Sequence, residues 1–174
     1  MQVQIFSNYY PEHQALYQDI FNFTKDDVGW IYPNYDKWYH ETFLPDLKEG
    51  HRSYIISARG HVLSGCCLLK NTPEEQKICT LYVGRNYRRQ GIGSDLMTAA
   101  LQELKGNPII TVSPGLLSDF APFLSHFYFQ AAYRKNNGRH NGYDICFQQT
   151  VPAVIQRVAC PWQPPHYELI KIKE

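Results

Sequence analysis

The feature that most constrains this sequence is a strand-like apolar run that passes through a short basic segment into a glycine-rich helix start. The segment reads Leu81, Tyr82, Val83, Gly84, Arg85, Asn86, Tyr87, Arg88, Arg89, Gln90, Gly91, Ile92, Gly93 and Ser94. A helix N-terminus offers unpaired backbone N–H groups and the positive end of the helix dipole, and glycines let a phosphate approach that backbone. The segment therefore predicts a phosphate or pyrophosphate site, although two glycines alone are equally compatible with a plain strand–helix connection.

The remaining periodicity predicts a mixed chain in which helices alternate with strands only in the second half. We expect strands over residues 3–6, 53–58, 61–69, 77–83, 108–112 and 143–149, and helices over residues 12–22, 35–48, 91–104 and 118–130. This order favours an α/β protein (α+β by some schemes) with a mixed sheet and helices on both faces. We expect one domain over residues 1–150 and a proline-containing extension over residues 151–174, either an arm or an extra edge strand.

Composition excludes several classes of protein. The 174 residues are 44% hydrophobic with a net charge of +1, which argues against a disordered chain and against a general nucleic-acid binder. No apolar run approaches the roughly 18 residues of a membrane span, and the N-terminus lacks signal-peptide character, so we expect a cytoplasmic protein without a membrane partner. The five cysteines show no metal-ligand spacing, so we expect reduced thiols and no metal.

The phosphate segment resembles the GCN5-related N-acetyltransferase (GNAT) superfamily, whose acyl-CoA loop has the pattern Q/R-x-x-G-x-G/A. Arg88, Gly91 and Gly93 match its defined positions. The resemblance implies a mainly antiparallel sheet of about seven strands flanked by about four helices, with a bulged strand before the loop. It also implies acetyl-CoA as co-substrate, bound by Leu81, Tyr82, Val83, Arg88, Arg89, Gln90, Gly91, Ile92, Gly93 and Ser94.

A second stretch is similar to the family pattern F-Y-x-x-x-G-F. Phe127 and Tyr128 match its first two positions, whereas Ala132 and Tyr133 replace the Gly and Phe, and Ala121 stands where an Asn is common. The resemblance implies that Tyr128 protonates the departing CoA thiolate, while the alternative is an aromatic side chain on an apolar helix face. No general base is assigned, because residues 77–83 contain no carboxylate.

The first helices and their connecting loop form the acceptor wall in the resembled fold. Residues 1–43 hold 12 of the 25 aromatic residues, and Trp30 and Tyr32 in the expected loop are the candidate substrate contacts. Residues 1–50 carry 3 lysines against 8 acidic residues, which favours a cationic amine on a small molecule or protein.

Two alternatives remain open. A toxin-like acetyltransferase acting on aminoacyl-tRNA would use the basic residues Arg134, Lys135, Arg139 and His140. A non-catalytic acyl-CoA-binding regulatory module would explain the missing base. A homodimer is compatible with either alternative and with the enzyme.

Overall fold

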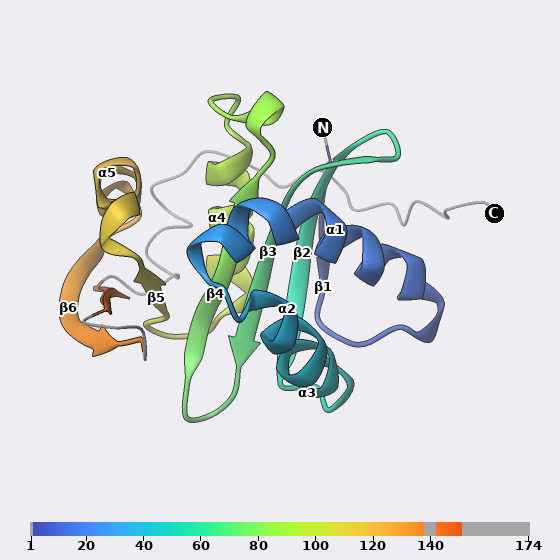
Figure 1. The fold of residues 1–174 in the computed structure, drawn as a ribbon, viewed down its shortest axis with the longest axis horizontal. Coiled ribbons are helices and arrows are strands. Elements are labelled where there is room, and N and C mark those ends of the chain that lie inside the picture. Colours follow the sequence, from blue (N-terminus) through green and yellow to red (C-terminus); the bar gives the residue numbers. More distant parts are fainter. Residues whose placement is uncertain (1, 138–141, 151–174) are drawn as a thin grey trace.

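The computed structural model describes residues 2–137 and 142–150 (Figure 1). Its strands are β1 (Gln2–Phe6), β2 (Arg52–Arg59), β3 (Val62–Asn71), β4 (Gln76–Val83), β5 (Ile109–Val112), β6 (Phe129–Asn136) and β7 (Tyr143–Gln149). Its α-helices are α1 (Gln14–Ile31), α2 (Tyr35–Trp38), α3 (Leu44–Lys48), α4 (Ile92–Glu103) and α5 (Leu117–His126). Short 3₁₀ turns, η1 (Pro11–His13), η3 (Arg85–Tyr87) and η4 (Pro114–Leu116), precede α1, α4 and α5.

The strands form one sheet in the order β1-β2-β3-β4-β5-β7-β6. All neighbouring strands pair antiparallel except β4 and β5, which pair parallel. The predicted fold class is therefore confirmed: a mixed, mainly antiparallel seven-stranded sheet. The single parallel pair lies in the middle of the sheet, where α4 connects β4 to β5.

Each face of the sheet has its own hydrophobic core. On one face, α1 to α3 bury Ile20, Tyr39 and Phe43 against alternate residues of β2 and β3. On the other face, α4 packs Leu96 and Met97 against the opposite residues of the same strands, together with residues of α5. Figure 1 shows α1 to α3 in front of the sheet and α4 behind it. Helices thus cover both faces, as the sequence predicts.

Two local features of the fold can be explained from the sequence. The Arg59-Gly60 turn joins β2 to β3, and Gly60 has the positive φ of 63° that a tight hairpin requires. The predicted helix over residues 35–48 is a continuous helical segment in which a π-helical turn, η2 (Tyr39–Phe43), separates α2 from α3. Pro45, which has no N–H to donate, lies in the first turn of α3 directly after this π-helical turn, where the helical hydrogen-bond pattern changes.

The first long helix extends further than the sequence suggests. We expected a helix over residues 12–22 and a loop at Gly29, whereas α1 continues to Ile31. Glycine lowers helix stability by only about 1 kcal/mol, and tertiary packing outweighs that cost. The buried Thr24 hydroxyl lies 2.9 Å from the Tyr35 hydroxyl and ties this part of α1 to α2.

The predicted helix over residues 118–130 is wrong at its C-terminal end. Helix α5 ends at His126, Tyr128 adopts a left-handed φ of 63°, and β6 begins at Phe129. The apolar spacing of Phe120, Phe123 and Phe127 mimics a continuing helix, but pairing of β6 with β7 fixes the extended backbone from Phe129 onward.

Some predictions fall outside the described residues. They are the extension over residues 151–174 and the basic residues Arg139 and His140. Across residues 2–137 and 142–150, no helix combines the length and apolar character needed to cross a membrane.

Candidate active site

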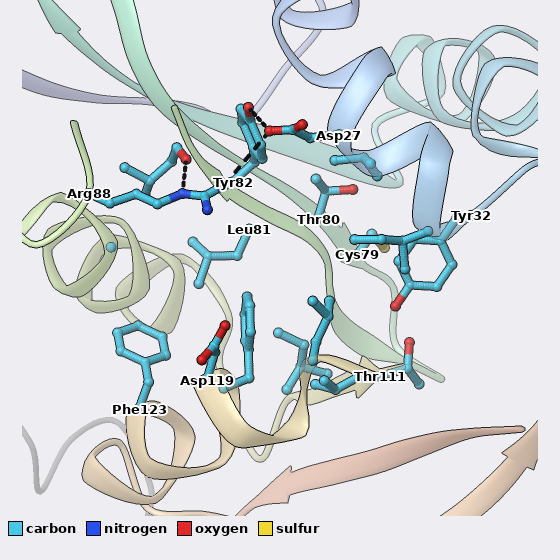
Figure 2. Close-up of a pocket in the computed structure, with 18 of the residues that line it drawn as sticks. Asp27, Tyr32, Cys79, Thr80, Leu81, Tyr82, Arg88, Thr111, Asp119 and Phe123 are labelled. Carbon is cyan, nitrogen blue, oxygen red and sulfur yellow. Dashed lines mark hydrogen bonds and ion pairs between the residues drawn. The ribbon is translucent and has the colours of Figure 1, made fainter. Parts of the chain in front are cut away.

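The site begins where β4 and β5 separate. These two strands pair only at Lys77 with Ile109 and Ile78 with Ile110, although both continue beyond that point. The side of β4 facing β5 therefore has no strand partner from Cys79 onward. A pocket of about 630 Å³ occupies this divergence and is walled by β4, β5, α1 and the start of α5 (Figure 2).

A β-bulge marks the inner end of the divergence. Leu68 of β3 lies opposite Thr80, whereas Leu69 lies opposite Ile78, so Cys79 has no partner in β3. This agrees with the bulged strand that the family resemblance implies. A bulge turns the strand locally and leaves backbone groups unpaired, so the following residues can hydrogen-bond an extended ligand.

The basic loop and the start of α4 form the other end of the site. Arg89 and Gly91 both have left-handed φ values, 59° and 84°, and no side chain caps the first turn of α4. Successive N–H groups in such a loop and first turn can bind one anion. Gly91 is the N-cap, and a Cβ there would meet nothing within 4 Å, so the glycine is required by conformation rather than by space.

Six of the ten predicted cofactor-binding residues line the pocket: Leu81, Tyr82, Val83, Arg88, Arg89 and Gly93. The other four do not belong to its lining. Gln90 hydrogen-bonds Arg59 and the Asn86 carbonyl, and Ile92 is buried in the core beneath α4. Gly91 and Ser94 contribute the helix N-terminus beside the pocket, so their backbone is what a ligand can reach.

Asp27 connects α1, at one wall of the pocket, to the basic loop that leads to α4. Its Oδ2 accepts a hydrogen bond from the Tyr82 hydroxyl at 2.8 Å and one from Arg85 Nε at 3.1 Å, and Arg85 Nη2 also pairs with Oδ1. Arg88 Nη2 lies 3.7 Å from the same carboxylate, and Arg88 Nε donates a hydrogen bond to the Val83 carbonyl. Hydrogen bonds from Arg85 and Tyr82 lower the pKa of Asp27.

The hydrogen bond to Asp27 also affects Tyr82. Burial, and to a smaller extent the hydrogen bond that Tyr82 donates to the Asp27 carboxylate, raise the pKa of Tyr82 to about 12. Tyr82 therefore stays protonated at neutral pH. Its hydroxyl serves to fix Asp27 at the wall of the pocket.

The structure separates the two predicted acceptor contacts. Tyr32 follows α1 and lines the pocket beside Cys79 and Thr111 (Figure 2). Trp30 lies within α1, not in a loop, and its side chain is 88% exposed and outside the pocket lining. Most acidic residues of the segment 1–50 also lie outside the pocket. Asp27 is the only one of them in the pocket lining, and it is paired with Arg85.

Tyr128, the predicted acid, is not among the pocket-lining residues. It follows α5, its side chain is 49% exposed, and its carbonyl accepts hydrogen bonds from the backbone and hydroxyl of Thr150. A left-handed residue directly after a helix favours glycine. This conformation supports an alignment with the F-Y-x-x-x-G-F pattern that is shifted by four residues. In the shifted alignment, Tyr128 and the buried Phe129 correspond to the final Gly and Phe, and Leu124 corresponds to the Tyr.

Sequence reasoning missed five polar residues of the pocket: Asp27, Thr80, Thr111, Ser118 and Asp119. Asp27 had no local signal, because its partners Tyr82 and Arg85 are more than 50 residues away. The position of Thr111 depends on the divergence of β4 and β5. Asp119 lies in the first turn of α5, where the helix dipole explains an acidic residue without any ligand.

The cysteines agree with the prediction of reduced thiols at the described positions. Cys66, Cys67, Cys79 and Cys146 are free, and burial raises the pKa of Cys66 to about 12 and raises that of Cys79. Arg52 Nη1 lies 3.3 Å from Cys79 Sγ and is itself paired with Asp46. A protonated thiol is a poor nucleophile. Within residues 2–137 and 142–150, no three His, Cys, Asp or Glu side chains are grouped as a metal site.

A pocket at diverging parallel strands, with a phosphate-binding helix start at one end, defines the acetyltransferase type of fold. Comparison with known proteins agrees. Residues 13–113 match the model of the acetyltransferase (GNAT) family, which covers more than half of the chain. The chain therefore belongs to this family.

Solved structures show the same fold at low sequence identity. Aminoglycoside 6′-N-acetyltransferase complexed with coenzyme A is 12% identical, with a TM-score of 0.65 over 87% of this chain and 98% of that one. The PaiA N-acetyltransferase from Thermoplasma acidophilum, in complex with coenzyme A, is 15% identical, with a TM-score of 0.60 over 87% and 100% of the two chains. Tetrahymena GCN5 is 12% identical, with a TM-score of 0.62 over 86% and 95%. The comparison with curated proteins found no significant match.

Proposed function

We propose that the protein is an N-acetyltransferase that moves the acetyl group of acetyl-CoA to a primary amine of a small molecule or protein by direct attack. The observation that carries this proposal is the continuity of the pocket. It runs from Arg88, Arg89 and Gly93 at the phosphate-binding end to Tyr32 at the α1 end, along the unpaired side of β4.

The residues present fit acetyl-CoA. The first-turn N–H groups of α4 and the side chains of Arg88 and Arg89 would hold the diphosphate. The backbone of residues 79–83 would pair with the pantetheine arm, because β5 leaves that side of β4 free. Acetyl-CoA supplies the activated acetyl thioester, and the pocket would keep its carbonyl next to β4 while excluding water.

The acceptor would enter at the α1 end. Val28, Ile31 and Tyr32 form this wall, with Thr80 and Thr111 opposite. Aromatic and aliphatic side chains would hold the body of the amine, and hydroxyl groups would orient its polar atoms.

A non-catalytic acyl-CoA-binding module is the second candidate. It is favoured by one observation: the aromatic residues of α5 that face the pocket, Phe120 and Phe123, carry no hydroxyl, and Tyr128 lies outside the lining. The tRNA-modifying alternative has less support, since Arg134 and Lys135 lie on β6 and not in the pocket lining. A cytoplasmic location, a homodimer and a domain limit at residue 150 stay predictions from the sequence.

Two measurements test the proposal. A ligand that binds only the folded protein at 100 times its Kd adds about 2.7 kcal/mol of stability, so acetyl-CoA should raise the Tm by several degrees. Thioester consumption with a panel of amines then separates an enzyme from a module. No shift in Tm contradicts acetyl-CoA binding, and a shift without turnover for any amine leaves the module.

A further inference from the structure

The first turn of α5 brings a carboxylate into the pocket. Asp119 lines it together with its neighbours Ser118 and Phe120. Figure 2 shows the Asp119 side chain turned from α5 into the pocket, toward the β4 strand that carries Leu81. Phe120, Phe123 and Leu81 surround this part of the pocket with apolar groups. Asp119 is itself exposed, so an ion that enters the pocket can reach its carboxylate, with an attraction that solvent weakens.

The other carboxylate of the pocket is already committed. Asp27 pairs with Arg85 and Arg88 and accepts the Tyr82 proton, and hydrogen bonds from Arg85 and Tyr82 lower its pKa. A carboxylate with a lowered pKa is a weak base. Its negative charge is already balanced by the neighbouring arginines, so it attracts an ammonium group only weakly. Asp119 takes part in none of these contacts, and it approaches the pocket from the opposite wall.

The other ionisable side chains of the pocket lining are two phenols (Tyr32 and Tyr82), the Cys79 thiol and two arginines. Burial raises the pKa of Tyr82 and of Cys79, so both stay protonated near neutral pH. Arg88 and Arg89 are cations at the phosphate end. The described lining of the pocket contains neither His nor Glu.

We propose that Asp119 is a catalytic residue that binds the ammonium form of the acceptor and accepts a proton from its nitrogen during transfer. This inference rests on the proposed function and adds the proton acceptor that the sequence left unassigned. Asp119 first accepts one proton from the ammonium group, which frees the nitrogen lone pair, and releases that proton to solvent. The neutral nitrogen then forms a bond to the acetyl carbon as the bond from that carbon to sulfur breaks, and the electron pair of the broken bond leaves on the CoA sulfur. The second proton, lost from the nitrogen as the amide forms, passes to the Asp119 carboxylate and from there neutralises the thiolate.

Asp119 also has a structural role, which the experiment must distinguish from the proposed catalytic role. As an acidic residue in the first turn of α5, it stabilises the helix through the dipole. Asp36 in the first turn of α2 has the same placement and lies outside the pocket lining, which makes Asp36→Asn a matched control.

The experiment measures initial rates with acetyl-CoA and four acceptors: 2-phenylethylamine, spermidine, kanamycin and a lysine-containing tetrapeptide. With the best acceptor, Asp119→Asn should lower kcat by about 10²- to 10⁴-fold, the usual effect of losing a positioned acid or base. The KM for acetyl-CoA and the Tm shift with acetyl-CoA should stay within twofold of the unchanged protein. Asp119→Glu should recover part of the rate, and formate should accelerate Asp119→Ala, since a small carboxylate can replace the missing group. Asp36→Asn should change neither constant.

Unchanged kcat in Asp119→Asn, or a loss that Asp36→Asn reproduces, would overturn the role of Asp119 while leaving the proposed function intact. A loss of rate that appears only as a raised KM for acetyl-CoA would also overturn it. Absence of turnover with all four amines would overturn the proposed function, and this inference with it.

Discussion

The Tyr82 hydroxyl donates a 2.8 Å hydrogen bond to Asp27 Oδ2, which joins the last turns of α1 to the end of β4 across 55 residues of sequence. The same carboxylate pairs with Arg85, in the loop that leads to the phosphate-binding turn. One acidic side chain therefore fixes the α1 wall of the pocket relative to the loop that leads to α4. Disturbing it should affect both parts of the site.

Asp27→Asn should make stability less dependent on acid pH. Hydrogen bonds from Arg85 and Tyr82 lower the folded-state pKa of Asp27, so its stabilising effect is complete above its unfolded pKa of about 4 and is lost as pH falls through the folded value. The unchanged protein should therefore have the higher Tm at pH 7, and the difference should shrink below about pH 4. Thermal melts from pH 3 to pH 7 measure this, and a difference that does not vary with pH would contradict it.

Gly91→Glu should abolish the acetyl-CoA-induced rise in Tm. Gly91 has a φ of 84° at the N-cap of α4, and a carboxylate there would repel the diphosphate. Gly91→Ala is the control for backbone strain alone, which costs about 1–2 kcal/mol in a left-handed conformation. If Gly91→Glu responds to acetyl-CoA as fully as Gly91→Ala does, the diphosphate binds elsewhere.

Tyr32→Ala should raise the KM for the amine about tenfold, which corresponds to about 1.4 kcal/mol of lost binding. Tyr32 lines the pocket, whereas Trp30, two residues earlier, is 88% exposed and outside it. Trp30→Ala should therefore leave the KM within twofold. Steady-state kinetics on both variants test this, and a larger effect from Trp30→Ala would move the acceptor contact to the outer face of α1.

Tyr128→Phe tests whether Tyr128 is the general acid, as the family pattern implies, or has no catalytic role, as its position outside the pocket lining indicates. A positioned general acid contributes about 10²- to 10⁴-fold to the rate. Because Tyr128 follows α5 and lies outside the pocket lining, we expect its kcat to change less than twofold. A loss in the 10²-fold range, with unchanged acetyl-CoA binding, would restore Tyr128 as the acid.

The sequence predicted the structure well where the local conformation depends on residues close to one another in the chain. The glycines of the α4 start, the Arg59-Gly60 turn and the repeat of Ile92, Leu96 and Ala100 are each explained within a few residues. The prediction over residues 118–130 failed because the helical spacing of Phe120 and Phe123 continues to Phe127, past the end of α5 at His126, and only the pairing of β6 with β7 fixes the extended backbone that follows.

The sequence by itself determined the class of fold, the glycine-containing start of α4 and the aromatic character of the first helices, because hydrophobic period and glycine position act locally. The tertiary structure decided which side chains share the pocket. The divergence of β4 from β5 opens the pocket, and only the packing of α1 and α5 around it places Asp27, Tyr32 and Asp119 on its walls. Such contacts join residues far apart in the chain, so no spacing along the sequence encodes them.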